Sequence, residues 1–156
     1  MKALATATGL YKCGGLGLEA LFMEWIVKSL AEDGTALIVI PDGILSNLAN
    51  KKLREYILDR CTIEGIISLP INTFFGTPKK TYILAIKKKY TDDLGNTQKQ
   101  VAPVFTYICN SIGETLDVYR FDTEENHLEE AVNQYNLFKS TPDRSKFLSL
   151  IHISEP

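Results

Sequence analysis

Two short apolar runs constrain the fold of this chain more than any other feature of its sequence. They are residues 35–40 (TALIVI) and 62–69 (TIEGIISL), and a proline, Pro41 or Pro70, follows each of them directly. Strands that face solvent on one side alternate apolar and polar residues, whereas strands covered on both faces do not. We therefore expect two buried strands of a parallel sheet that lies between helices.

Helical periodicity lies before the first run and again between the two runs. The stripe before the first run consists of Leu18, Leu21, Phe22, Trp25, Ile26 and Ser29. Trp25 is at its centre and is expected in the core. Ser46 is expected to cap the second helix, on which Ala49, Leu53, Tyr56 and Ile57 share one face. The order helix, strand, helix, strand makes one βαβ unit with a leading helix and predicts an α/β architecture.

Two further strands follow the loop at residues 70–80. Residues 81–86 (TYILAI) predict a third strand, and residues 101–109 (VAPVFTYIC) predict a fourth. The polar stretch between them predicts a turn, so we expect these two strands to form a hairpin at the end of the sheet. Pro103 indicates an edge position or a late start for the fourth strand.

A last helix is expected near the end of the chain. Residues 122–125 (DTEE) resemble a capping box, with Asp122 in the place of the usual Ser or Thr. Leu128, Ala131 and Tyr135 then follow at helical spacing, and the helix is expected to end near Lys139.

Charge and cysteine content restrict the classes of protein to consider. The 156 residues carry a formal net charge of -2, so any DNA contact must come from local basic clusters such as Lys79-Lys80. The three cysteines are far apart and form no CxxC pair, which favours a reduced, cytoplasmic compartment and predicts no zinc site. No apolar run approaches the roughly 20 residues that span a bilayer.

Several segments, taken in order, carry a family resemblance. They are 19–22 (EALF), 30–34 (LAEDG), 38–45 (IVIPDGIL), 66–70 (IISLP), 74–75 (FF), 80–84 (KTYIL), 110–113 (NSIG) and the helix at 128–138. In this order and spacing they resemble the second half of the methylase subunit of type I restriction-modification systems. The resemblance covers roughly residues 17–140.

The resemblance implies a fold class and a division of the chain. The fold would be a partial Rossmann-like, S-adenosylmethionine-dependent methyltransferase fold: a mixed sheet with an antiparallel hairpin at one edge and flanking helices. Residues 1–17 would form an entry loop, and residues 18–140 the C-terminal half of an N6-adenine DNA methylase domain. Residues 141–156 stay unassigned, and their final stretch has no counterpart in the family.

The resemblance also implies the chemistry, which is methyl transfer from S-adenosylmethionine to the exocyclic amine of adenine in DNA. A stacked duplex hides that amine, so the base must be flipped out and held on an aromatic face. By resemblance this face belongs to Phe75, or to Phe74 if the register differs by one residue. Lys79 and Lys80 would contact DNA phosphates. Partners would be DNA, a specificity subunit and a restriction (motor) subunit.

Two parts of the family's catalytic centre do not occur in this sequence. The 156 residues contain no Pro-Pro pair, and therefore no Asn-Pro-Pro-aromatic motif to accept the hydrogen bonds of the adenine amine. They also lack a strand followed by an acid-flanked Gly-x-Gly cofactor loop. We expect both to lie upstream, and the chain alone to be inactive.

Each candidate residue also has a plainer interpretation. Phe74 and Phe75 would be a core plug beneath a long loop, and Lys79 and Lys80 would be solvated surface charges. Pro41 and Asp42 follow a strand end and are expected to act behind the residues that touch ligand, although Pro-Asp-Gly is also ordinary turn chemistry.

Two alternative functions remain open. The chain could be a non-catalytic methyltransferase-like module that binds DNA or protein. It could also be a small nucleotide-binding domain that uses Gly15-Leu16-Gly17 as a phosphate loop and Asp42 as the ribose acid.

Overall fold

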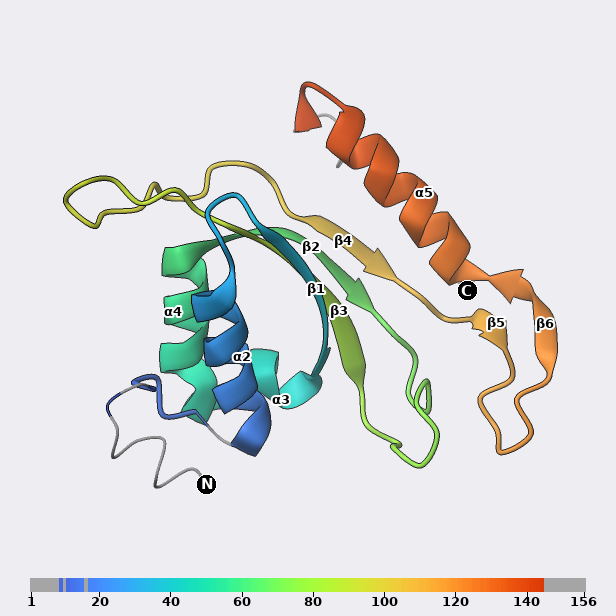
Figure 1. Cartoon of the computed structure of the whole chain (residues 1–156). Helices are drawn as coiled ribbons and strands as arrows, with labels where there is room; N and C mark the ends of the chain where they lie inside the picture. The colour runs from blue at the N-terminus through green and yellow to red at the C-terminus, as the bar shows by residue number, and fades with distance from the viewer. Residues whose placement is uncertain (1–8, 10, 16, 145–156) are drawn as a thin grey trace.

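The computed structural model describes residues 9, 11–15 and 17–144 (Figure 1). The predicted entry loop is therefore described only in part, and residues 145–156 of the predicted tail lie outside the described residues. The helices are α2 (Gly17–Ser29), α3 (Asp42–Ser46), α4 (Lys51–Arg60) and α5 (His127–Ser140), with a 3-10 turn at Leu48–Asn50. The strands are β1 (Thr35–Pro41), β2 (Cys61–Ser68), β3 (Thr81–Lys88), β4 (Phe105–Ile108), β5 (Ile112–Glu114) and β6 (Asp122–Asn126). The predicted order of helix, strand, helix and strand is confirmed.

Four strands form the main sheet in the order β1-β3-β2-β4. Strand β3 runs antiparallel to both β1 and β2, and β4 runs parallel to β2. The fold class is confirmed as a mixed α/β sheet, but the predicted hairpin of the third and fourth strands is wrong. The reason is burial: Leu84, Ala85 and Ile86 are consecutive and all buried, which requires cover on both faces and hence a central position.

Strand β4 behaves as Pro103 indicated. It pairs with β2 alone within the described residues, so it lies at an edge, and it begins only at Phe105. Its connection to β3 is long enough to pass β2 and reach the far side of the sheet (Figure 1).

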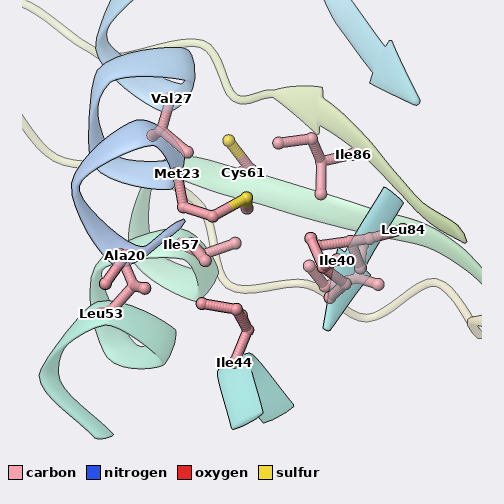
Figure 2. Close-up of a cluster of buried hydrophobic side chains, with 11 residues drawn as sticks. Ala20, Met23, Val27, Ile40, Ile44, Leu53, Ile57, Cys61, Leu84 and Ile86 are labelled. Carbon is pink, nitrogen blue, oxygen red and sulfur yellow. The ribbon is translucent and has the colours of Figure 1, made fainter. Parts of the chain in front are cut away.

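Helices cover the two faces of the sheet unequally (Figure 1). Helices α2, α3 and α4 pack on one face and close the main core, where Val27, Leu53 and Ile86 are fully buried (Figure 2). Helix α5 packs on the other face over β4 and β2, where Phe105 meets Phe138 and Tyr135. The helix predicted from Leu128 to Lys139 is confirmed as α5.

The predicted apolar stripe of α2 faces the wrong way. Trp25 is 52% exposed, and Leu18 and Phe22 are exposed with it, so the expectation of a core Trp25 is wrong. The helix buries Ala20, Met23, Glu24 and Val27 instead. Apolar residues occur all around this helix, so their spacing does not identify the face that packs. The buried face also includes a glutamate, and a pattern based on apolar residues places a glutamate in solvent.

Glu24 is buried because its carboxylate is fully engaged. It accepts hydrogen bonds from the backbone N–H groups of Lys12 (2.8 Å) and Cys13 (3.0 Å) and from Lys28 Nζ (2.9 Å). Burial raises the pKa of Glu24, but the hydrogen bonds from Lys12, Lys28 and Cys13 outweigh burial and hold the pKa below its ordinary value. The carboxylate thus ties the segment before α2 to the helix.

The prediction that residues 35–40 are covered on both faces is also wrong. Strand β1 pairs only with β3 within the described residues, which makes it an edge strand. Leu37 is 71% exposed and Val39 50% exposed, because helix α5 covers the other end of that face. Composition alone could not reveal this, because an apolar run of six residues can form either a central strand or an edge strand.

Two predicted helix caps are wrong as well. Ser46 is the last residue of α3, because the chain turns into that short helix directly after Pro41. Asn47 caps the following 3-10 turn by accepting from the N–H of Ala49. Asp122 begins β6, and the cap of α5 is Asn126, whose side chain accepts from the N–H groups of Leu128 and Glu129.

The main core gives a matched pair of stability variants on α4. Leu53 is 0% exposed, whereas Leu58 on the same helix is 53% exposed. Leu53→Ala leaves a cavity and is expected to lower the free energy of unfolding by about 2–5 kcal/mol, while Leu58→Ala changes it by about 0.5 kcal/mol or less. Urea denaturation of both variants checks this, and equal losses would contradict the assigned core.

The Glu24 network predicts a pH dependence of stability. Since the folded-state pKa lies below the ordinary value of 4.5, the ionised carboxylate stabilises the fold above that pH, and this stabilisation is lost as the pH falls through the folded-state pKa. At neutral pH, Glu24→Gln is expected to lower the free energy of unfolding by about 1–3 kcal/mol. The difference in free energy of unfolding between wild type and variant should decrease as the pH is lowered from about 6 to about 3. Exposed Glu55→Gln is the control and should show almost no difference at any pH.

The open edge of β1 predicts self-association of the isolated chain. An unpaired apolar edge strand recruits further strands, so sedimentation velocity should show a coefficient that rises with protein concentration. Val39→Lys, on the bare face, should reduce this rise, whereas Leu48→Lys, at a residue 80% exposed in the 3-10 turn, should not. A concentration-independent monomer with wild-type sequence would rule out this behaviour.

Candidate functional site

The carboxyl ends of three strands lie together at one end of the sheet, which we call the carboxyl edge to distinguish it from the edge strands β1 and β4. Pro41 of β1 pairs with Thr81, Ser68 of β2 pairs with Tyr82, and Ile108 of β4 pairs with Ser68. Because β3 begins where the other strands end, the loop at residues 69–80 lies at this same edge. Ligands of open α/β sheets bind at the carboxyl ends of the strands, which makes this edge the candidate site.

The loop carries its two phenylalanines on a tight turn. The N–H of Thr77 donates to the carbonyl of Phe74 at 3.0 Å, and Gly76 has a φ of +70°. A turn of this kind requires positive φ at its third residue, which glycine adopts without strain. Phe75 is 74% exposed and Phe74 is 42% exposed. Neither ring belongs to a buried cluster, so the core-plug interpretation is wrong.

The turn between β5 and β6 lies beside this loop (Figure 1). Arg120 Nη2 donates to the carbonyl oxygen of Asn72 at 2.5 Å. A hollow of about 370 Å³ lies between the two segments, lined by Asn72, Phe74, Phe75, Gly76, Thr77, Pro78, Leu116, Asp117, Val118 and Arg120. The sequence analysis assigned no role to residues 115–121. The alternation of aromatic and basic residues in Tyr119-Arg120-Phe121 was the available signal.

Asp42 lies at the same edge, outside the lining of the hollow. It is the first residue of α3, and its carboxylate accepts hydrogen bonds from Ser46 Oγ (2.6 Å) and from Tyr82 Oη (3.2 Å). Its backbone N–H donates to the carbonyl of Lys80 at 3.0 Å. Burial and then the Asp42 carboxylate raise the pKa of Tyr82, which keeps its hydroxyl protonated and donating. Pro41 and Asp42 are not among the residues that line the hollow.

The two predicted phosphate-binding lysines occupy different environments. Lys80 is half-buried, its Nζ donates to the carbonyl of Leu69 at 2.5 Å, and it lies 5.7 Å from the centre of the Tyr82 ring. It therefore joins the two ends of the loop. Lys79 is exposed and follows Pro78, which lines the hollow.

The glycine run before α2 packs against helices. Gly15 is buried, and a Cβ at that position would lie 2.6 Å from Ala20 Cβ and from Asn50 Oδ1. The space beside it is about 10 Å³, far below the roughly 300 Å³ or more of small-molecule sites. None of residues 9 and 11–15 is in a strand, which a dinucleotide loop requires before its glycines. Neither a dinucleotide nor S-adenosylmethionine fits these residues.

Within residues 17–144, no helix combines the length and the apolar content needed to cross a bilayer.

Comparison with known proteins gives a consistent family. Residues 18–155 match the model of the N-6 DNA Methylase family. The methylase subunit of the type I restriction enzyme EcoKI of Escherichia coli K12 is 31% identical over 68 residues, which is 43% of this chain and 13% of that protein. The EcoEI methylase subunit of Escherichia coli is 36% identical over 70 residues, 44% of this chain and 14% of that protein. The chain thus spans about an eighth to a seventh of the curated relatives that it matches.

Solved structures agree on the fold. The crystal structure of the EcoKI M protein matches with a TM-score of 0.50 and 26% identity, over 59% of this chain and 19% of that one. A modification subunit of a putative type I restriction enzyme from Vibrio vulnificus YJ016 matches with a TM-score of 0.55 over 76% of this chain and 25% of that one, and its 20% identity speaks for the fold alone. Since the family model covers most of the sequence, this chain belongs to the N-6 DNA methylase family.

Proposed function

We propose that this chain supplies the target-base side of an enzyme that methylates the N6 atom of adenine in DNA. In this proposal the enzyme is the modification subunit of a type I restriction-modification system, and residues 18–140 belong to its methylase domain. Family membership supports the proposal, as do relatives that are methylase subunits of type I restriction enzymes.

The exposed ring of Phe75 is the observation that carries the proposal. A phenylalanine that is 74% exposed presents an apolar ring to solvent, and a ligand that covers it removes that surface from water. A flipped base offers a flat π face of matching size, and stacking on it is worth about 1–3 kcal/mol. The ring lies at the carboxyl edge of the sheet, on the lining of the hollow, where a base could reach it.

The neighbouring residues hold this ring in place. Lys80 joins the ends of the loop through the carbonyl of Leu69, and the backbone N–H of Asp42 holds the carbonyl of Lys80. Tyr82 and Ser46 fix the Asp42 carboxylate in turn. We propose that these groups position the loop, and that Lys79 contacts a phosphate beside the flipped base.

The remaining parts of the reaction are proposed to come from outside these residues. S-adenosylmethionine supplies the methyl group, and the glycine run near α2 does not fit it. The sequence has no Asn-Pro-Pro-aromatic motif to hold the adenine amine. We therefore propose that the chain alone transfers no methyl group, and that the active complex forms in the cytoplasm with a specificity subunit and a restriction (motor) subunit.

Substitution of Phe75 tests this function. In the methylase subunit that contains this segment, assembled with its specificity subunit, Phe75→Ala should slow methyl transfer by roughly five- to 150-fold, the equivalent of about 1–3 kcal/mol of lost stacking. The assay measures N6-methyladenine formed in unmethylated DNA with a labelled methyl donor. Phe75→Trp keeps a stacking face and should retain most of the rate.

Tyr90→Ala is the matched control, because Tyr90 is 65% exposed and follows the opposite end of β3. It should leave the rate unchanged. Full activity of both Phe75→Ala and Phe74→Ala would remove the stacking role. DNA binding without any methyl transfer by the wild-type complex would favour a non-catalytic module instead.

A further inference from the structure

We infer that the turn at residues 115–121 forms the second wall of the base site, and that Arg120 binds a backbone phosphate of the strand whose base lies on Phe75. This inference rests on the proposed function and extends it to a segment for which the sequence analysis gave no role. It concerns a single class of ligand, a strand of nucleic acid in which one nucleotide is unstacked.

The hollow has two apolar walls from segments far apart in the sequence. Phe74 and Phe75 belong to one wall, and Leu116 and Val118 belong to the other. Its volume of about 370 Å³ falls within the roughly 300–1,000 Å³ of sites that hold small ligands. A flat base between the two walls would cover apolar surface on both sides, which a site with one wall cannot achieve.

Arg120 supplies positive charge at the border of this hollow. One of its guanidinium nitrogens donates to the carbonyl of Asn72, which uses only part of the five-donor capacity of the group. A guanidinium can therefore hold the loop and bind a phosphate oxygen at the same time. Arg120 is half-buried, so its position is more restricted than that of an exposed lysine.

The acidic residue of the same turn, Asp117, offsets part of this charge, because Arg120 acts on its carboxylate electrostatically as well as through a backbone N–H. The Asp117 carboxylate accepts hydrogen bonds from the N–H of Tyr119 (2.8 Å), the N–H of Arg120 (3.2 Å) and Thr115 Oγ1 (3.1 Å). The Tyr119 bond is the largest of the effects that lower the pKa of Asp117. The carboxylate thus shapes the turn that presents Arg120.

The backbone at this contact is held in an unfavourable conformation on both sides. Asn72 has a φ of +64° and Arg120 a φ of +54°, and these are the two residues that the hydrogen bond joins. Residues other than glycine rarely adopt positive φ, and such residues concentrate at ligand clamps. Asn adopts this region more readily than other residues with a side chain, so Arg120 is the less favourable of the two.

The aromatic neighbours of Arg120 fit a nucleic-acid strand. Tyr119 and Phe121 flank it in the sequence, their rings stack with centroids 5.8 Å apart, and they are 77% and 63% exposed. Alternation of stacking rings with a cation is the pattern with which proteins bind single-stranded nucleic acid, because rings stack on bases and the cation binds phosphate.

The salt dependence of binding tests Arg120 directly. The probe is a fluorescein-labelled single-stranded 12-mer of deoxyadenosine, and its binding to the methylase subunit that contains this segment is followed by anisotropy at several salt concentrations. Arg120→Gln keeps a donor for the Asn72 carbonyl but removes the charge. It should weaken binding and make the slope of log K against log salt shallower by roughly 0.7, the value for one phosphate contact to a single strand. Lys99→Gln removes the same charge from an exposed site in the loop after β3 and should leave the slope unchanged.

A second variant keeps the result interpretable if the first disturbs the loop. Arg120→Lys restores the charge and should restore the slope. An unchanged slope in Arg120→Gln, an equal change in Lys99→Gln, or a failure of Arg120→Lys to restore the slope would overturn the phosphate contact. If Phe75→Ala impairs methyl transfer while Arg120→Gln binds with the wild-type slope, only this inference fails. If both Phe75→Ala and Phe74→Ala retain full methyl transfer, the stacking role in the proposed function fails whatever Arg120 does.

Discussion

The antiparallel insertion of β3 between β1 and β2 is the constraint on which the rest of the structure depends. A strand that runs opposite to its neighbours must begin where they end, so the connection from β2 has to stay at the carboxyl edge of the sheet. A parallel third strand would have required a crossover back to the other edge. The direction of one strand therefore places the loop at residues 69–80, with its two phenylalanines, at the edge where α/β sheets bind ligands.

The same edge gathers the groups that hold this loop. Three elements take part: Asp42 at the start of α3 and Arg120 of the β5–β6 turn bind the loop backbone, and Tyr82 of β3 holds the Asp42 carboxylate. A stacking ring is useful only if it is held close to its productive position before the ligand arrives. Contacts from separate elements restrict the loop more than its own turn at Phe74–Thr77 could, because hydrogen bonds within a turn do not orient it relative to the sheet.

Sequence reasoning found the local elements but missed how they are placed. It found the strands at 35–40, 62–69 and 81–86 and the final helix, because each depends on spacing within a short window, whereas the stacking role of the phenylalanine pair came from the family resemblance alone. It missed that β1 lies at an edge and that α2 buries Glu24 rather than Trp25. Both errors arise from long-range contacts, since the N–H groups that satisfy Glu24 come from the segment before the helix. The role of residues 115–121 depends on Asn72, more than forty positions away, which no local pattern contains.

Three unusual residues of this chain show how a structural exception differs from a functional one. Glu24 is a buried carboxylate, a feature often associated with active sites, yet its oxygens are occupied by two backbone N–H groups and a lysine of the same chain. The fold itself therefore explains why this carboxylate is buried. Phe75 and Arg120 are different, because one leaves a ring in water and the other has donors beyond the one it gives to Asn72. The exposed ring and the remaining donors lie at the carboxyl ends of the strands, where α/β sheets bind ligands. A ligand explains both better than packing does.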